Sequence, residues 1–115
     1  MPLSLKELAS SAGARIVVHA QRAASLRIAR VFASDKISEL LHHGGPDTLL
    51  LTTLANPHLL RAASLVGAPA LCLTGGGDIP PSLRAGAEAH GIVLLHTLDN
   101  LAQAMARFQD GRRTD

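Results

Sequence analysis

A run of three glycines is the most informative candidate for binding chemistry in this sequence. Thr74-Gly75-Gly76-Gly77-Asp78 directly follows the apolar segment Ala70–Leu73. Glycine lets a backbone turn at positive φ and approach a ligand closely, and successive N–H groups can surround an anion. Asp78 would repel a phosphate, and the run lacks the lysine and Ser/Thr of a phosphate-binding loop. A tight turn that needs positive φ is the commoner reason for such glycines.

A second group of polar residues follows the preceding apolar segment. Thr52, Thr53 and Asn56 come after Leu49–Leu51, in the position equivalent to that of the glycine run. If the two segments are neighbouring parallel strands, both groups lie at the edge where open α/β sheets bind ligands. They would then form one polar rim for a small ligand. The simpler interpretation of Asn56 is a helix N-cap, because Pro57 follows it at the first helical position.

The six histidines do not form a metal-binding pattern. His42 and His43 are adjacent, so on a helix their side chains point about 100° apart. His90 and His96 flank the last expected strand, and no His-x-x-x-His or Cys/His spacing occurs. Histidines near helix C-termini are already favoured by the helix dipole. We therefore expect no metal site.

The sequence also predicts no catalytic residue. Cys72 lies within an apolar run, where a thiol behaves as a small hydrophobic group. The serines lack the setting of a nucleophile elbow, and no pair of carboxylates is placed by its spacing. The alternative is a small hydrolase, or a phosphoryl or acyl transferase, that uses the Thr74–Asp78 loop with Asp78 or His96 as acid or base.

A parallel sheet is needed to bring these polar groups together, and the second half of the chain has the pattern of one. Short uninterrupted apolar segments alternate with helical patterns, which is typical of parallel strands buried on both faces. The expected strands are Thr48–Thr52, Ala70–Leu73 and Ile92–Leu95, and the expected helices begin at Asn56 and Pro81 and end at Gly67 and Ala89. A closing helix is expected to present Leu98, Leu101, Met105 and Phe108 on its inner face.

The first half of the chain is less regular. Its pattern predicts a helix over Leu5–Ala12, a strand over Arg15–His19, a loop over Ala20–Ser25, a half-buried strand from Leu26 to Val31 or Phe32, and a helix that Ser34 caps and Gly44 ends. The strand order within residues 14–32 stays open. We expect one α/β domain over residues 1–110, with a polar C-terminal tail over residues 111–115. Its largely parallel sheet should have about four to five strands, with helices on both faces.

Size, composition and charge exclude several classes of protein. The 115 residues are 47% hydrophobic and 17% charged, as in a single folded domain. No apolar run approaches the ~20 residues of a membrane helix, and no secretory stretch precedes Lys6. The net charge is +2, its basic residues are scattered, and the only aromatic residues are two phenylalanines, which disfavours nucleic-acid binding. A single cysteine fits a cytoplasmic protein.

Four segments resemble a known family in their order and spacing. They are Ser34-Asp35-Lys36-Ile37-Ser38-Glu39-Leu40, Thr52-Thr53-Leu54-Ala55-Asn56, Ala63-Ser64-Leu65-Val66-Gly67-Ala68 and Leu73-Thr74-Gly75-Gly76. Together with the Gly91–Leu95 strand and the helix after it, they resemble the DRTGG domain over residues 3–108. The Asp-Arg…Thr-Gly-Gly signature of that family should fall before Ser34. Ser25–Val31 stands there instead, so Arg27 alone keeps a match and the glycines are absent.

The resemblance implies a regulatory module and not an enzyme. DRTGG domains occur beside CBS domains in regulated pyrophosphatases, in long phosphotransacetylases and after P-loop amidotransferase-like synthetase domains. A related fold forms the N-terminal domain of HPr kinase/phosphorylase. The resemblance predicts a homodimeric, non-catalytic domain without a resident cofactor, which binds a partner protein, a nucleotide or other small anion, or both. The candidate ligand-binding residues are Thr52, Thr53, Asn56, Thr74, Gly75, Gly76, Gly77 and Asp78.

Overall fold

The computed structural model describes residues 3–113, which form short strands and helices in alternation. The strands are β1 (Leu3–Ser4), β2 (Arg15–Val18), β3 (Arg27–Ile28), β4 (Arg30–Ala33), β5 (Thr48–Thr52), β6 (Ala70–Leu73) and β7 (Val93–His96). The helices are α1 (Leu5–Ala12), α2 (Ala20–Ala23), α3 (Ile37–His43), α4 (His58–Leu65), α5 (Pro81–His90) and α6 (Leu101–Arg113).

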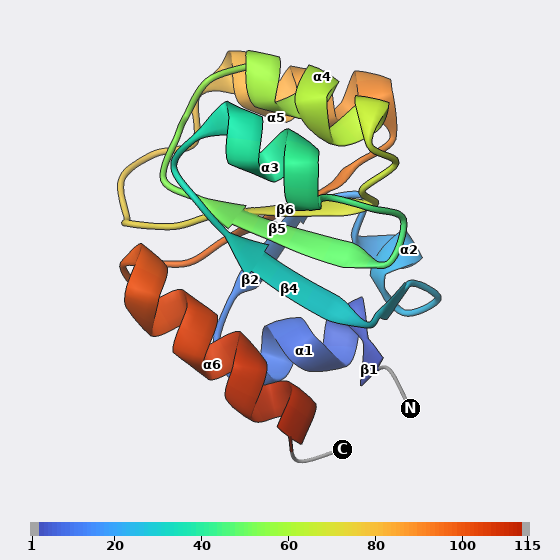
Figure 1. The fold of residues 1–115 in the computed structure, drawn as a ribbon, viewed down its shortest axis with the longest axis vertical. Coiled ribbons are helices and arrows are strands. Elements are labelled where there is room, and N and C mark those ends of the chain that lie inside the picture. Colours follow the sequence, from blue (N-terminus) through green and yellow to red (C-terminus); the bar gives the residue numbers. More distant parts are fainter. Residues whose placement is uncertain (1–2, 114–115) are drawn as a thin grey trace.

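A five-stranded sheet in the order β2-β7-β6-β5-β4 lies at the centre, with helices on both faces (Figure 1). Strands β4 to β7 are parallel, and β2 pairs with β7 in the antiparallel direction. Helices α3, α4 and α5 connect the parallel strands and cover one face of the sheet. The expected α/β fold with a largely parallel sheet is therefore confirmed.

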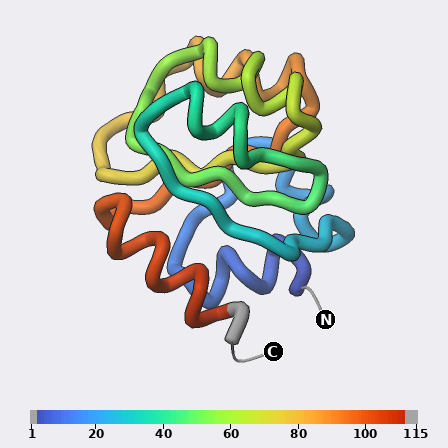
Figure 2. The backbone as a smooth tube through the Cα atoms, in the orientation of Figure 1, coloured from blue at the N-terminus to red at the C-terminus, as the bar shows by residue number. Residues whose placement is uncertain are grey.

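Alternation along the strands divides the core into two halves. Leu50, Leu71 and Leu94 point toward α3, α4 and α5. Their strand neighbours, such as Leu49 and Leu95, point toward α1 and α6. The latter two helices pack side by side (Figure 2). Burial on both faces is the reason why these strands read as unbroken apolar runs.

The strand predicted from Leu26 onward is wrong, because the chain forms two separate strands there. The first, β3, pairs with β1 in a small antiparallel sheet, whereas β4 joins the main sheet beside β5. Ile28 and Val31 both enter the core against α1 and α6. Residues an odd number of positions apart cannot share one face of a continuous strand, so the chain must break between them.

Three further local predictions need correction. The predicted loop over Ala20–Ser25 contains the single-turn helix α2. Ser34 does not cap α3, which begins at Ile37; its Oγ accepts a hydrogen bond from Lys36 N at 3.1 Å and closes a turn before the helix. Leu98 is 80% exposed and not on the inner face of the last helix.

The last helix begins after Leu98 and runs past the expected domain boundary. Asn100 and Gln103 exchange hydrogen bonds of 3.1 and 2.8 Å at its start, so the chain turns into α6 only there. The helix extends to Arg113, so part of the predicted polar tail is helical. Residues 114–115 of that tail lie outside the described residues.

Candidate functional site

The carboxyl ends of β5 and β6 bring the predicted site residues to one edge of the sheet. Thr52 of β5 is in register with Leu73 of β6, so the loops that follow both strands start side by side. Thr74 donates hydrogen bonds to Thr52 O from its N–H, at 2.9 Å, and from its hydroxyl, at 3.3 Å. The geometry that the sequence predicted for these two loops is present.

The two threonines at the end of β5 are held by a carboxylate from the neighbouring loop between β4 and α3. Asp35 Oδ1 accepts hydrogen bonds from Thr53 N at 2.8 Å, Thr53 Oγ1 at 2.6 Å and Thr52 Oγ1 at 3.3 Å. The pKa of Asp35 is lowered, chiefly by the Thr53 hydroxyl. Asp35 therefore ties the β4–α3 loop to the β5–α4 loop, and both hydroxyl groups donate within the protein.

Asn56 has the capping role that the simpler interpretation gave it. Its Oδ1 accepts a hydrogen bond of 2.9 Å from His58 N at the start of α4. An N-cap satisfies a backbone donor that the helix itself leaves unpaired. This side of the predicted rim is thus occupied by its own hydrogen bonds.

The glycine loop is a turn whose first two amides are also used internally. Gly75, Gly76 and Gly77 have φ values of 95°, 78° and 82°, which only glycine adopts readily. Gly75 N donates to Asp99 O at 2.7 Å, and Gly76 N donates to Thr97 O at 3.4 Å. These two hydrogen bonds attach the glycine loop to the segment that connects β7 with α6. The two amides are therefore not free to surround an anion as the sequence suggested.

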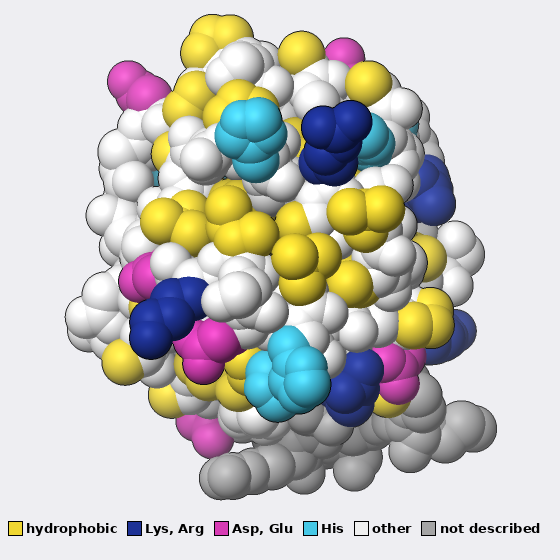
Figure 3. All heavy atoms as spheres, turned by 45° about the horizontal axis from the view of Figure 1, so that its top comes forward, with side chains coloured by type: hydrophobic (Ala, Val, Ile, Leu, Met, Phe, Trp, Pro, Cys, Tyr) yellow, Lys and Arg dark blue, Asp and Glu magenta, His cyan; other side chains and the backbone are white. Residues whose placement is uncertain are grey.

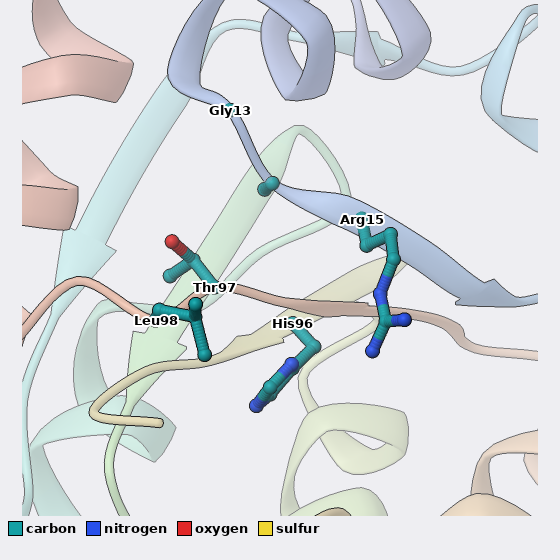
Figure 4. Close-up of a pocket in the computed structure, with 6 residues that line it drawn as sticks. Gly13, Arg15, His96, Thr97 and Leu98 are labelled. Carbon is teal, nitrogen blue, oxygen red and sulfur yellow. The ribbon is translucent and has the colours of Figure 1, made fainter. Parts of the chain in front are cut away.

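Two adjoining cavities open beside the glycine loop, at the end of β7. Their volumes are about 420 and 520 Å³, within the range of about 300–1,000 Å³ that is usual for small-molecule sites. Arg15, His96 and Leu98 line both cavities, and Figure 4 shows them in the smaller one. The smaller cavity is completed by Gly13, Ala14 and Thr97, and the larger one by Gly77, Asp78, Ile79 and Arg84.

Arg15 and His96 form a direct cross-strand pair. They are register partners in the antiparallel pair of β2 and β7, so their side chains share one face of the sheet with Cβ atoms about 4.5–5.5 Å apart. Figure 4 shows both side chains extending to the same side of the strands, with Leu98 on the other side of the imidazole. His96 is only 7% exposed, and its Nε2 has no hydrogen-bond partner within the described part of the chain.

Sequence reasoning missed this corner of the edge. Arg15 and Arg84 were not among the candidates, and His96 entered only as an acid or base of the enzyme alternative. A signal was present: His96 and Thr97 end their apolar strand with polar residues, as Thr52 and Thr74 do. Arg15 gave no such signal, because its place beside His96 depends on the direction of β2.

The structure offers little for nucleophilic or metal chemistry. Cys72 is fully buried, and burial raises the pKa of its thiol to about 12. It is therefore a thiol at neutral pH and a poor nucleophile. Among residues 3–113, no group of three or more His, Cys, Asp or Glu side chains is placed to hold a metal ion. No helix in that range is long and apolar enough to cross a membrane.

Comparison with solved structures shows that the fold is DRTGG-like, as the sequence segments suggested. The chain is similar to the crystal structure of the CBS and DRTGG domains of the regulatory region of Clostridium perfringens pyrophosphatase, complexed with the activator diadenosine tetraphosphate. The TM-score is 0.73 and the identity 14%, over 95% of this chain and 47% of that one. The chain thus spans about half the length of that structure. No family model and no curated protein matches the sequence.

Proposed function

We propose that this protein is a non-catalytic regulatory domain that senses a small anionic ligand, such as a nucleotide, at the carboxyl edge of its sheet. The observation that carries the proposal is the pair of cavities lined by Arg15 and by His96, whose buried Nε2 lacks a partner among the described residues. Buried polar groups are nearly always hydrogen-bonded, so a ligand is the natural partner.

The charge around the larger cavity favours an anion. Two arginines, Arg15 and Arg84, line it together with a single carboxylate residue, Asp78. The similar pyrophosphatase regulatory region was crystallised with an anionic dinucleotide activator, which supports the same ligand class for this chain.

A regulatory domain also needs a partner, and we propose a homodimer or a complex with a separate protein in the cytoplasm. Ala62, Ala63 and Ala104 do not contribute to such an interface, because they are buried within the domain itself. Hydrophobic side chains instead gather on the face that Figure 3 brings forward. The exposed Leu41 and Leu65, on α3 and α4, belong to this helical layer.

Thermal denaturation with a panel of adenine nucleotides, guanine nucleotides and acyl phosphates tests the sensing function. A ligand at 100 times its Kd adds about 2.7 kcal/mol to the free energy of unfolding and so raises Tm by several degrees. We expect at least one member of the panel to do so. Unchanged melting curves across the panel would contradict ligand sensing and leave only the protein-partner function.

One observation favours the alternative of a small hydrolase or transferase: Asp78 and His96 line the same cavity. Incubation with the same nucleotides and acyl phosphates distinguishes the two functions. The regulatory proposal predicts no turnover. If the wild-type protein releases phosphate and the Asp78→Ala variant does not, the regulatory proposal is contradicted and the protein is an enzyme.

A further inference from the structure

We infer that Arg15, Arg84 and His96 form a subsite for the phosphate group of a phosphorylated organic ligand, and that the glycine loop is not the anion-binding element. This inference rests on the proposed sensing function and identifies the residues that recognise the ligand.

His96 has a buried ring nitrogen without a partner among the described residues. The other residues of β7, Val93, Leu94 and Leu95, are apolar and fully buried. His96 lies between its register partners Leu73 on β6 and Arg15 on β2, and neither offers a hydrogen-bond acceptor from its side chain. A buried ring nitrogen in that position is completed only by a group that enters the cavity. An imidazole N–H at this position donates a hydrogen bond to a phosphate oxygen.

The two arginines that line the larger cavity differ from the paired arginines of the chain. Arg27, Arg30 and Arg107 pair with the carboxylates of Glu7, Asp47 and Asp99 at 3.8, 3.2 and 3.2 Å. Arg15 and Arg84, in contrast, have no ion pair or hydrogen bond to any residue that the structure describes. Two open guanidinium groups beside a buried donor match a phosphate, which arginine binds through two parallel hydrogen bonds.

The rest of the cavity indicates what the phosphate is attached to. Leu98 is 80% exposed and lines both cavities, so an apolar or aromatic group of the ligand can cover it. Asp78 can accept a hydrogen bond from a hydroxyl or amino group, such as those of a ribose or a nucleobase. The combination favours a nucleotide over a free phosphate ion.

Nuclear magnetic resonance of the labelled protein tests the subsite, with ATP, inorganic triphosphate and adenosine as separate probes. We expect ATP to move the signals of the Arg15 and His96 side chains, the Gly77 amide and the Leu98 methyl groups. Triphosphate should move the Arg15 and His96 signals more weakly, and adenosine only those of Leu98. Arg15→Ala and Arg84→Ala should each weaken ATP binding about tenfold or more, because each removes a charge-assisted contact. Arg61→Ala is the matched control: it makes the same charge change on α4, outside both cavities, and should bind ATP as the wild type does.

A second variant separates a ligand-binding role for His96 from a structural one. In His96→Leu we expect ATP affinity to fall about tenfold or more, while Tm stays at or above the wild-type value. A structural role predicts the reverse, a lower Tm with unchanged affinity. ATP binding that is unaffected in Arg15→Ala and Arg84→Ala overturns the subsite and leaves the sensing function intact. No response to ATP or triphosphate at millimolar concentrations also overturns the subsite, and the thermal panel then decides on sensing by itself.

Discussion

At the residue scale, His96 places a polar ring where its strand neighbours are apolar. Its Nε2 is buried without a partner among the described residues, and such a group costs about 1–3 kcal/mol of stability. Replacement by leucine, similar in size, removes that cost without leaving a cavity. We predict that His96→Leu raises the free energy of unfolding by about 1 kcal/mol, as measured by urea denaturation. A loss of that size would show that the ring has a partner in the free protein.

Asp35 is a residue-scale brace whose contribution depends on pH. Its pKa is lowered in the folded protein, with the Thr53 hydroxyl as the largest cause. A carboxyl group whose pKa is lowered by folding stabilises the folded state at pH values above its pKa in the unfolded chain, about 3.9. This stabilisation is lost as the pH falls through its pKa in the folded state. Because Asp35 is exposed, we expect Asp35→Asn to cost only about 1 kcal/mol at pH 7.

Urea denaturation of Asp35→Asn and the wild type at neutral and strongly acidic pH checks this prediction. The difference in unfolding free energy should shrink in acid, where the wild-type carboxyl group is protonated as well. An equal difference at both pH values would mean that the charge of Asp35 does not act through its threonine donors.

At the element scale, the parallel half of the sheet was predictable and the direction of β2 was not. Strands β5, β6 and β7 are buried on both faces, so their apolar runs and the helices between them define the topology. The residue pattern of Arg15–Val18 is compatible with a parallel or an antiparallel strand. Only the antiparallel pairing of β2 with β7 places Arg15 beside His96. The edge with Thr52, Thr53, Asn56 and the glycines was therefore predictable, whereas the cavity next to it was not.

The glycine loop follows β6 and is hydrogen-bonded to Thr97 and Asp99, which precede α6, and its positive φ angles are its main requirement. At Gly76, with φ 78°, a Cβ would lie at an ordinary contact distance of 3.9 Å from Leu98, and at Gly67, with φ 75°, it would meet no atom within 4 Å. We predict that Gly76→Ala and Gly67→Ala each destabilise the protein by about 1–2 kcal/mol, the cost of a left-handed L-residue. Thermal or urea denaturation measures both. Wild-type stability of Gly76→Ala, with Gly67→Ala destabilised, would show that the loop tolerates another backbone conformation.

At the scale of the whole molecule, the exposed leucines bear on the assembly. Leu65 is 75% exposed on α4 and shares its helical layer with the exposed Leu41 of α3, so this face offers apolar surface for a second molecule to cover. We predict a dimer of about twice the 12.0 kDa chain mass by light scattering, and a monomer for Leu65→Asp. A wild-type protein that scatters as a single chain at micromolar concentration would contradict the homodimer and leave this face to a different protein.

The cavities lined by Arg15 and His96 lie at the same edge of the sheet as the hydrogen-bonded Thr53–Asn56 loop. The structure of one ligand complex therefore shows which of the two binds the ligand. A crystal structure with bound ATP tests most directly whether this edge senses an anion. We predict phosphate density within hydrogen-bonding distance of His96 Nε2 and the Arg15 guanidinium, with the base against Leu98. Density at the Thr53–Asn56 loop, or an empty cavity in crystals grown at saturating ATP, would contradict it.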